Sequence, residues 1–148
     1  MHRMFKPSTV FFAGPVLAML FACTTTRTPP PASPLENITW RLVELNGQAA
    51  LPGPNQSTAQ LRFEGDSGRV TGSTGCNRLT GPYTRDGASL RFGPAITTRM
   101  ACADPRLNEQ EQRFVAALQA TERHQIERDT LTLLGSAGPV ARFAPAAQ

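Results

Sequence analysis

The chain has 148 residues, of which 15 are basic and 11 acidic, and this length suits one domain with a short leader or tail. Two of the 15 basic residues, Arg3 and Lys6, lie in the N-terminal segment. The other 13 are arginines, and they are interleaved along the chain with the 11 acidic residues. We see no basic stripe and no basic cluster with stacking aromatics, so we expect no nucleic acid partner.

Residues 1–22 are expected to be a secretory signal and not part of the fold. His2, Arg3 and Lys6 give a positive start, and the apolar run VFFAGPVLAMLFA ends directly at Cys23. The run is shorter than the about 20 residues that a membrane-spanning helix needs. An ordinary cleaved signal and an uncleaved anchor remain the alternatives.

The four residues LFAC at 20–23 resemble the bacterial lipobox, in which the cysteine becomes the first residue of the mature protein and carries lipid. The resemblance implies acylation of Cys23, and several acyl chains together anchor a protein firmly. Thr24 follows the cysteine in place of an aspartate. By similarity to enteric lipoprotein sorting, we expect an outer membrane lipoprotein of the bacterial cell envelope that faces the periplasm.

Residues 23–37 are expected to form the lipidated end and a tether. The segment TTTRTPPPASPLEN has four prolines, many hydroxyl residues and little apolar content, so it cannot bury a core. We therefore place the folded domain at 38–145, held away from the membrane by an extended linker.

The domain begins with a predicted strand, ITWRLVELNG. Within it, Trp40 and Leu42 are expected to face one side and Val43 and Leu45 the other, so that the strand would be covered on both faces. Two hairpins follow. AQLRFEG alternates cleanly and pairs with RVTGS, and GPYTRDGASLRFG turns at its Asp-Gly pair.

One helix is predicted over NEQEQRFVAALQAT. Asn108 is the expected N-cap, and Glu111 three residues later completes a capping-box pattern. An apolar stripe at helical spacing should cover the sheet. Its members are Leu107, Phe114, Val115 and Leu118.

Three more short strands are expected after the helix, in HQIERD, TLTLLG and PVARFAP. The order of strands, one helix and further strands predicts an α+β, mostly antiparallel β fold. We expect a small curled sheet or β-barrel-like domain with one helix packed against it.

Two cysteines, Cys76 and Cys102, lie in the predicted domain. In an exported protein two such cysteines usually pair, and closing this segment contributes about 3–4 kcal/mol of stability. Two free thiols are the alternative. A thiol nucleophile would need His124 as its base, and zinc would need further ligands. We expect no metal, no cofactor and no catalytic residue.

The segment GSTGCNRLTGPYT, followed by TTRMACADPRLNEQEQRF, resembles the META domain family, which includes HslJ-like heat-shock and envelope lipoproteins. The opening WRLVELNG and the closing strands fit as well, so the resemblance covers about 38–145. It implies a compact β-barrel-like sheet with a helix packed across it and carries no catalytic mechanism. Most marked positions, 75–77, Gly81 and 98–102, are interpreted as fold-defining.

Three residues of these motifs are candidates for binding. Arg99, beside an expected buried Met100, either bridges carbonyl groups within the fold or offers a fork for a carboxylate or phosphate ligand. Arg78 and Tyr83 lie close in sequence, and we expect them to share a surface with Arg99.

The sequence thus favours a non-enzymatic envelope lipoprotein with a META domain, in an accessory or stress-response binding role under heat or antibiotic stress. Its expected partners are the membrane, through lipid on Cys23, and an envelope protein or cell-wall component. Two alternatives are a small-ligand carrier and an inhibitor of a periplasmic hydrolase that acts through the loop 46–58.

Overall fold

Strict alternation of buried and exposed side chains builds most of the sheet in the computed structural model, which describes residues 34–147. In β3 (Ala59–Glu64), Leu61 and Phe63 are buried while Arg62 between them is exposed. β9 (Thr130–Gly135) buries Leu131 and Leu133 in the same way. One face of each strand therefore points into a common core.

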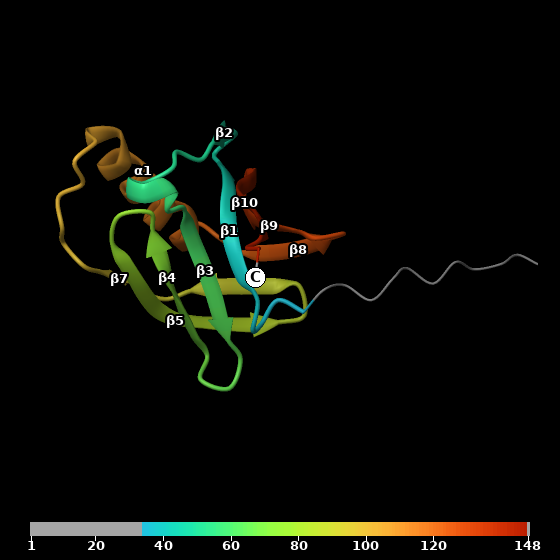
Figure 1. Ribbon diagram of the computed structural model, residues 1–148. Coiled ribbons are helices and arrows are strands. Elements are labelled where there is room, and N and C mark those ends of the chain that lie inside the picture. The colour runs from blue at the N-terminus through green and yellow to red at the C-terminus, as the bar shows by residue number, and fades with distance from the viewer. Residues whose placement is uncertain (1–33, 148) are drawn as a thin grey trace, which may run out of the picture. The chain divides into compact units, whose positions relative to one another are not determined.

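Eight of the strands close into an antiparallel β-barrel (Figure 1). The barrel closes because the first strand pairs with both β3 and the last strand. Around the barrel the order is β1 (Thr39–Leu45), β3, β4 (Arg69–Thr74), β5 (Arg78–Asp86), β6 (Ser89–Phe92), β8 (Arg123–Glu127), β9 and β10 (Gly138–Pro145). Two short strands, β2 (Gln48–Ala49) and β7 (Ile96–Thr97), pair with β1 and β5 respectively.

Both predicted hairpins and the strands after the helix are present. β3 pairs with β4, and β5 pairs with β6 through a turn in which Gly87 has a φ of 54°. Asp86 pairs with Ser89, so Gly87 is the first residue of a two-residue loop, where this left-handed conformation favours glycine. The α+β, barrel-like fold expected from the sequence is therefore confirmed.

The prediction that β1 is covered on both faces is wrong. A β-bulge between Leu42 and Glu44 shifts the register against β10. The extra residue brings Leu45 onto the same inner face as Trp40 and Leu42, and all three are buried. A bulge of this kind bends the strand and increases its twist, which helps a barrel to close.

The helix α1 (Pro105–Gln119) begins three residues before the predicted N-cap. Its N-cap is Asp104, whose carboxylate accepts a hydrogen bond from the backbone N–H of Arg106 at 2.9 Å. Pro105 at the first helical position is preorganised for a helix start. Asn108 instead accepts a hydrogen bond from the backbone N–H of Cys102 at 3.3 Å, so the predicted capping box is not formed.

The buried face of α1 lies against β1, β4, β6 and β10, which come from different parts of the barrel wall. The ring centroid of Phe114 lies 6.1 Å from that of Phe143 on β10. The predicted stripe is confirmed in Leu107, Phe114 and Leu118, whereas Val115 is half-buried. The helix thus seals the core that the strands leave open.

Large side chains fill the interior, among them Trp40, Phe63, Phe114 and Phe143, each fully buried. The indole N–H of Trp40 donates to the carbonyl of Leu35 at 2.9 Å, and Leu35 is itself part of the core. The packed part of the chain therefore begins upstream of the predicted start at residue 38. Within residues 34–147, no helix is long and apolar enough to cross a membrane.

Candidate functional site

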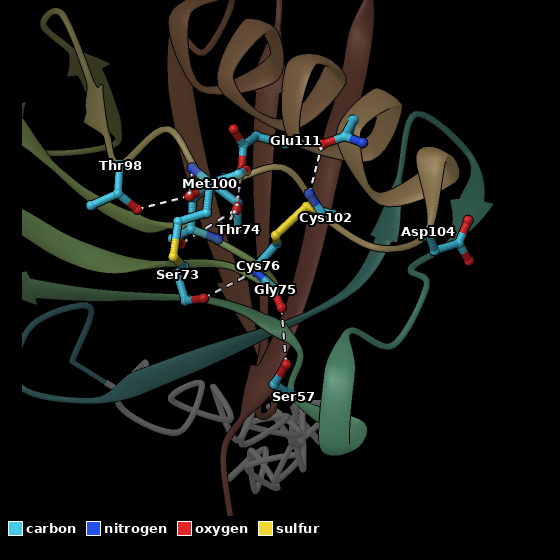
Figure 2. Close-up of a disulfide and its surroundings, with 12 residues drawn as sticks. Ser57, Ser73, Thr74, Gly75, Cys76, Thr98, Met100, Cys102, Asp104 and Glu111 are labelled. Atoms are coloured by element: carbon cyan, nitrogen blue, oxygen red, sulfur yellow. Dashed lines mark hydrogen bonds between the residues drawn. A yellow bond between two sulfur atoms is a disulfide. The ribbon is translucent and has the colours of Figure 1, made fainter.

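A disulfide joins Cys76 and Cys102, with their Cα atoms 6.0 Å apart (Figure 2). It links the turn between β4 and β5 to the segment that leads into α1. The pairing expected from the sequence is present in the structure. Neither sulfur is available as a nucleophile or a metal ligand in this state, so the thiol-enzyme and zinc alternatives find no support here.

The buried amide of Asn77 lies next to this disulfide and makes four hydrogen bonds. Its oxygen accepts from the hydroxyl of Thr98 at 2.8 Å and from the backbone N–H of Met100 at 2.9 Å. Its nitrogen donates to the backbone carbonyl of Met100 at 3.1 Å and to the carboxylate of Glu111 at 2.8 Å. These bonds satisfy both donors and both lone pairs of the amide.

The turn that carries Asn77 is closed by its own hydrogen bonds. The backbone N–H of Thr74 donates to the carbonyl of Asn77 at 2.8 Å, and the Thr74 hydroxyl accepts from the N–H of Asn77 at 3.0 Å. Gly75 has a φ of 95°, a conformation that a residue with a Cβ adopts only at a cost. The threonine and the glycine of the sequence TGCN therefore fit the shape of this turn.

Glu111 connects this turn to the helix. Its carboxylate accepts hydrogen bonds from the Asn77 amide and from the Thr74 hydroxyl. We call Thr74, Asn77, Thr98, Met100 and Glu111 the Asn77 node. Sequence reasoning missed the role of Glu111 because it placed the helix start at Asn108. The Asp104-Pro105 pair was the available signal for the earlier start.

The candidate binding residue Arg99 lies on the segment that the node holds. Its side chain is exposed and makes no hydrogen bond or ion pair with any described residue. Of the two roles considered for Arg99, bridging carbonyl groups within the fold is therefore wrong. Met100, expected to be buried, is 61% exposed. The node binds the backbone of this segment and leaves both side chains in solvent.

Arg78 and Tyr83 do not share a surface. Five residues apart on β5, they point to opposite faces, with Arg78 exposed and Tyr83 buried. Arg78 and the segment before Arg99 are neighbours instead, because the backbone N–H of Thr98 donates to the carbonyl of Arg78 at 3.1 Å. The structure therefore brings Arg78 and Arg99 to one area and removes Tyr83 from it.

Tyr83 packs edge-on against Phe63, with ring centroids 5.2 Å apart, and donates from its hydroxyl to Glu36 at 3.1 Å. Burial, together with the hydrogen bond and the negative charge of Glu36, raises the pKa of Tyr83 to about 12. Arg85 forms an ion pair with the same carboxylate at 3.4 Å. This cluster fastens the start of the folded chain to β5.

His124 is a half-buried strand residue of β8. Its Nδ1 lies 3.2 Å from the carbonyl of Ala88, and burial lowers its pKa. In residues 34–147 no group of three or more His, Cys, Asp or Glu side chains is placed to hold a metal ion.

The loop 46–58 is tied to the helix by Gln110, which is buried. The Gln110 side chain accepts from the backbone N–H of Leu51 at 2.7 Å and donates to the Leu51 carbonyl at 3.2 Å. The hydroxyl of Ser57 donates to the carbonyl of Gly75 at 2.9 Å, next to the disulfide. Most of the loop's side chains are nevertheless exposed.

The chain belongs to the META domain family, whose model matches residues 33–148. The match spans every described strand, the helix and the node. A search of the curated proteins gives no match.

Solved structures with the same fold come from several proteins. A protein from Burkholderia xenovorans, determined by NMR, is 26% identical with a TM-score of 0.63, and the alignment covers 82% of this chain and 93% of that one. A second NMR structure is 24% identical over 74% and 90%, with a TM-score of 0.59. A crystal structure of a DUF4847 family protein from Bacteroides vulgatus is 19% identical over 77% and 96%, with a TM-score of 0.55, and shows the fold alone.

Removal of the disulfide should lower stability only under oxidising conditions. For Cys76→Ala with Cys102→Ala we expect a loss of about 3 kcal/mol in the free energy of unfolding of the oxidised protein, because a cross-link across 26 residues restricts the unfolded chain. Chemical denaturation with and without a reductant measures this. Wild-type protein that unfolds alike in both conditions would contradict the prediction.

The Asn77 node can be tested with a variant of nearly unchanged shape. Asn77→Asp replaces the donor that faces Glu111 with a second carboxylate, so we expect a loss of about 3 kcal/mol at neutral pH. The loss should shrink in acid, where one of the two carboxylates takes up a proton. Urea denaturation at both pH values measures the difference.

Glu111→Gln in the Asn77→Asp background is the matched rescue. It restores a donor opposite an acceptor, so the double variant should be more stable at neutral pH than the Asn77→Asp variant alone. Equal stability of the two proteins would show that the contact between residues 77 and 111 contributes little.

The phenol of Tyr83 should lose its proton at an unusually high pH. Tyr83 is the only tyrosine, so near-ultraviolet phenolate absorbance follows this group alone. Its pKa is raised from 10.0 to about 12 in the folded protein, so the stability linked to this shift is fully present below pH 10 and is lost between pH 10 and 12. Glu36→Gln should move the titration part of the way back. A folded protein that titrates near pH 10 would refute the prediction.

Proposed function

We propose that this protein is a non-enzymatic lipoprotein of the bacterial cell envelope, acylated at Cys23 and facing the periplasm from the outer membrane. Cys23 and the lipobox-like LFAC lie outside the described residues. The disulfide within the domain supports export, because such bonds form and persist in oxidising compartments.

We further propose that the META domain binds another envelope protein or a cell-wall component, in an accessory role under heat or antibiotic stress. The observation that supports this is the role of the family motif's residues in the structure. The motif's cysteine is in a disulfide, and its asparagine and the partner carboxylate of Glu111 are bonded to each other. The motif thus holds an exposed segment in place, which is a property of a binding surface.

The hydrolase-inhibitor alternative has one supporting observation. An inhibitor needs an exposed loop of fixed shape, and the loop 46–58 is held at Leu51 by Gln110 and at Ser57 by the Gly75 carbonyl. The carrier alternative has less support, because large aromatic and leucine side chains occupy the barrel interior.

Lipid labelling tests the placement in the envelope. Cells fed a palmitate analogue should label the wild-type chain and leave the Cys23→Ala variant unlabelled and absent from the outer membrane fraction. Cys76→Ala is the control, since a cysteine in a disulfide carries no acyl chain. Labelling that persists in the Cys23→Ala variant would refute acylation at this residue.

The stress role is tested in a deletion strain that carries the wild-type gene, the Cys23→Ala variant or no copy. Growth under heat and under antibiotics should be restored by the wild-type chain alone. Equal growth of all three strains under every stress would contradict the role.

A further inference from the structure

Two large apolar side chains remain exposed in the described chain, and they lie four residues apart on one segment. Ile96 is 69% exposed and Met100 is 61% exposed. Isolated apolar residues on a surface are ordinary, and these two are of interest because they share one segment with exposed arginines around it.

Three arginines lie around this segment. Arg78 is hydrogen-bonded through its backbone to Thr98, and Arg99 follows directly. The guanidinium of Arg69 donates to the hydroxyl of Thr80 at 3.4 Å, and Thr80 is the cross-strand partner of Ile96. We call Arg69, Arg78, Ile96, Arg99 and Met100 the 96–100 surface.

The positive charge of this surface is not neutralised by ion pairs. Within residues 34–147, none of the three arginines has an acidic partner within ion-pair distance. Two carboxylates lie nearby, and their negative charges reduce the positive excess without forming ion pairs with these arginines. Glu64, opposite Arg69, accepts from Ser67 and Thr71, and Glu111 accepts within the Asn77 node.

The surface is fixed before any partner arrives. The Asn77 amide bonds both the N–H and the carbonyl of Met100, and the disulfide holds Cys102 two residues further on. A preordered segment loses little conformational entropy when it binds.

We propose that the 96–100 surface docks the domain onto an anionic lipid bilayer, with Ile96 and Met100 entering the headgroup region and the arginines binding lipid phosphates. Charge complementarity supports this occupant, because arginine guanidinium groups match phosphate oxygens. This segment alone is smaller than a stable protein interface, which buries about 800 Å² on each partner, so the envelope partner proposed above would need further surface of the domain. Its two exposed apolar side chains suffice for a shallow interfacial contact.

The docking deepens the proposed function and rests on it in one respect. A domain linked to lipid at Cys23 would meet the membrane at high effective concentration, so that a weak contact is enough. The contact itself requires no acyl chain, and it is tested on a chain that lacks Cys23. All core residues of the described chain lie between Leu35 and Phe143, so a chain of residues 24–148 keeps them all.

The test is co-sedimentation of this chain with vesicles of phosphatidylcholine, with or without about one-third phosphatidylglycerol. We expect binding to the anionic vesicles only, weakened by salt. Arg78→Gln with Arg99→Gln should reduce the partition coefficient by more than tenfold, about fivefold for each arginine. Ile96→Ser with Met100→Ser should reduce it by a similar factor.

Arg91→Gln with Arg123→Gln is the matched control, since it removes the same charge from exposed positions on β6 and β8. This control should lose less than half of the binding. Fluorescence of the buried Trp40 verifies that each variant is folded. Equal loss in the control, or retention of binding by the Ile96 and Met100 variant, would overturn the proposal.

Absence of binding to anionic vesicles would also overturn the proposal. If the chain bound poly-glutamate but not these vesicles, the surface would be reassigned to an acidic protein segment. Lipid labelling at Cys23 is unaffected by any of these outcomes. Failure of the docking and failure of the lipoprotein proposal are therefore distinguishable.

Discussion

One buried amide, that of Asn77, determines how three distant segments of this domain meet. Asn77 itself lies in the turn between β4 and β5. Its four hydrogen bonds reach the segment of Thr98 and Met100 and, at Glu111, the helix. A buried amide that lost one of these partners would retain the full desolvation cost, so each segment holds the others in register. The described residues contain no buried side-chain nitrogen or oxygen without a hydrogen bond, which shows how completely this polar chemistry is satisfied.

The disulfide and the Asn77 node constrain the same segment through different physical effects. The cross-link acts mainly on the unfolded chain, by reducing its conformational entropy. The amide acts on the native state, by pairing groups that would otherwise be buried without partners. Reduction of the disulfide would therefore lower stability while the node still defined the local geometry of Met100. The family motif combines the two in adjacent residues, Cys76 and Asn77.

Much of the fold was predictable because it depends on local rules. The alternation around Leu61 and Phe63 and the Asp-Gly turn at Gly87 specify strands and a hairpin without long-range information. The pairing of Cys76 with Cys102 followed from the expected compartment and from the small number of thiols. The β1 bulge was not predictable in this way, because a single inserted residue leaves no periodic signal.

The details of the site depended on contacts between distant residues. Tyr83 was assigned to the Arg78 surface by closeness in sequence, although an odd separation along a strand points to the opposite face. Glu111 suggested a local capping box, and its real partners lie in another segment, at Thr74 and Asn77. Exposure of Met100 could not be read from its sequence neighbours, because the node binds its backbone and leaves its side chain outside.

Closure of the barrel by the two ends of the domain has a consequence for its biogenesis. β10, near the end of the chain, supplies one neighbour of β1, and the N–H of Ala146 also donates to the carbonyl of Thr39. A chain that emerges from a ribosome with its N-terminus first therefore cannot complete the sheet until β10 has emerged. Until then the inner face of β1, with Trp40 and Leu42, lacks its final cover. Completion of the barrel therefore has to wait for β10, although the strands upstream of it are already made.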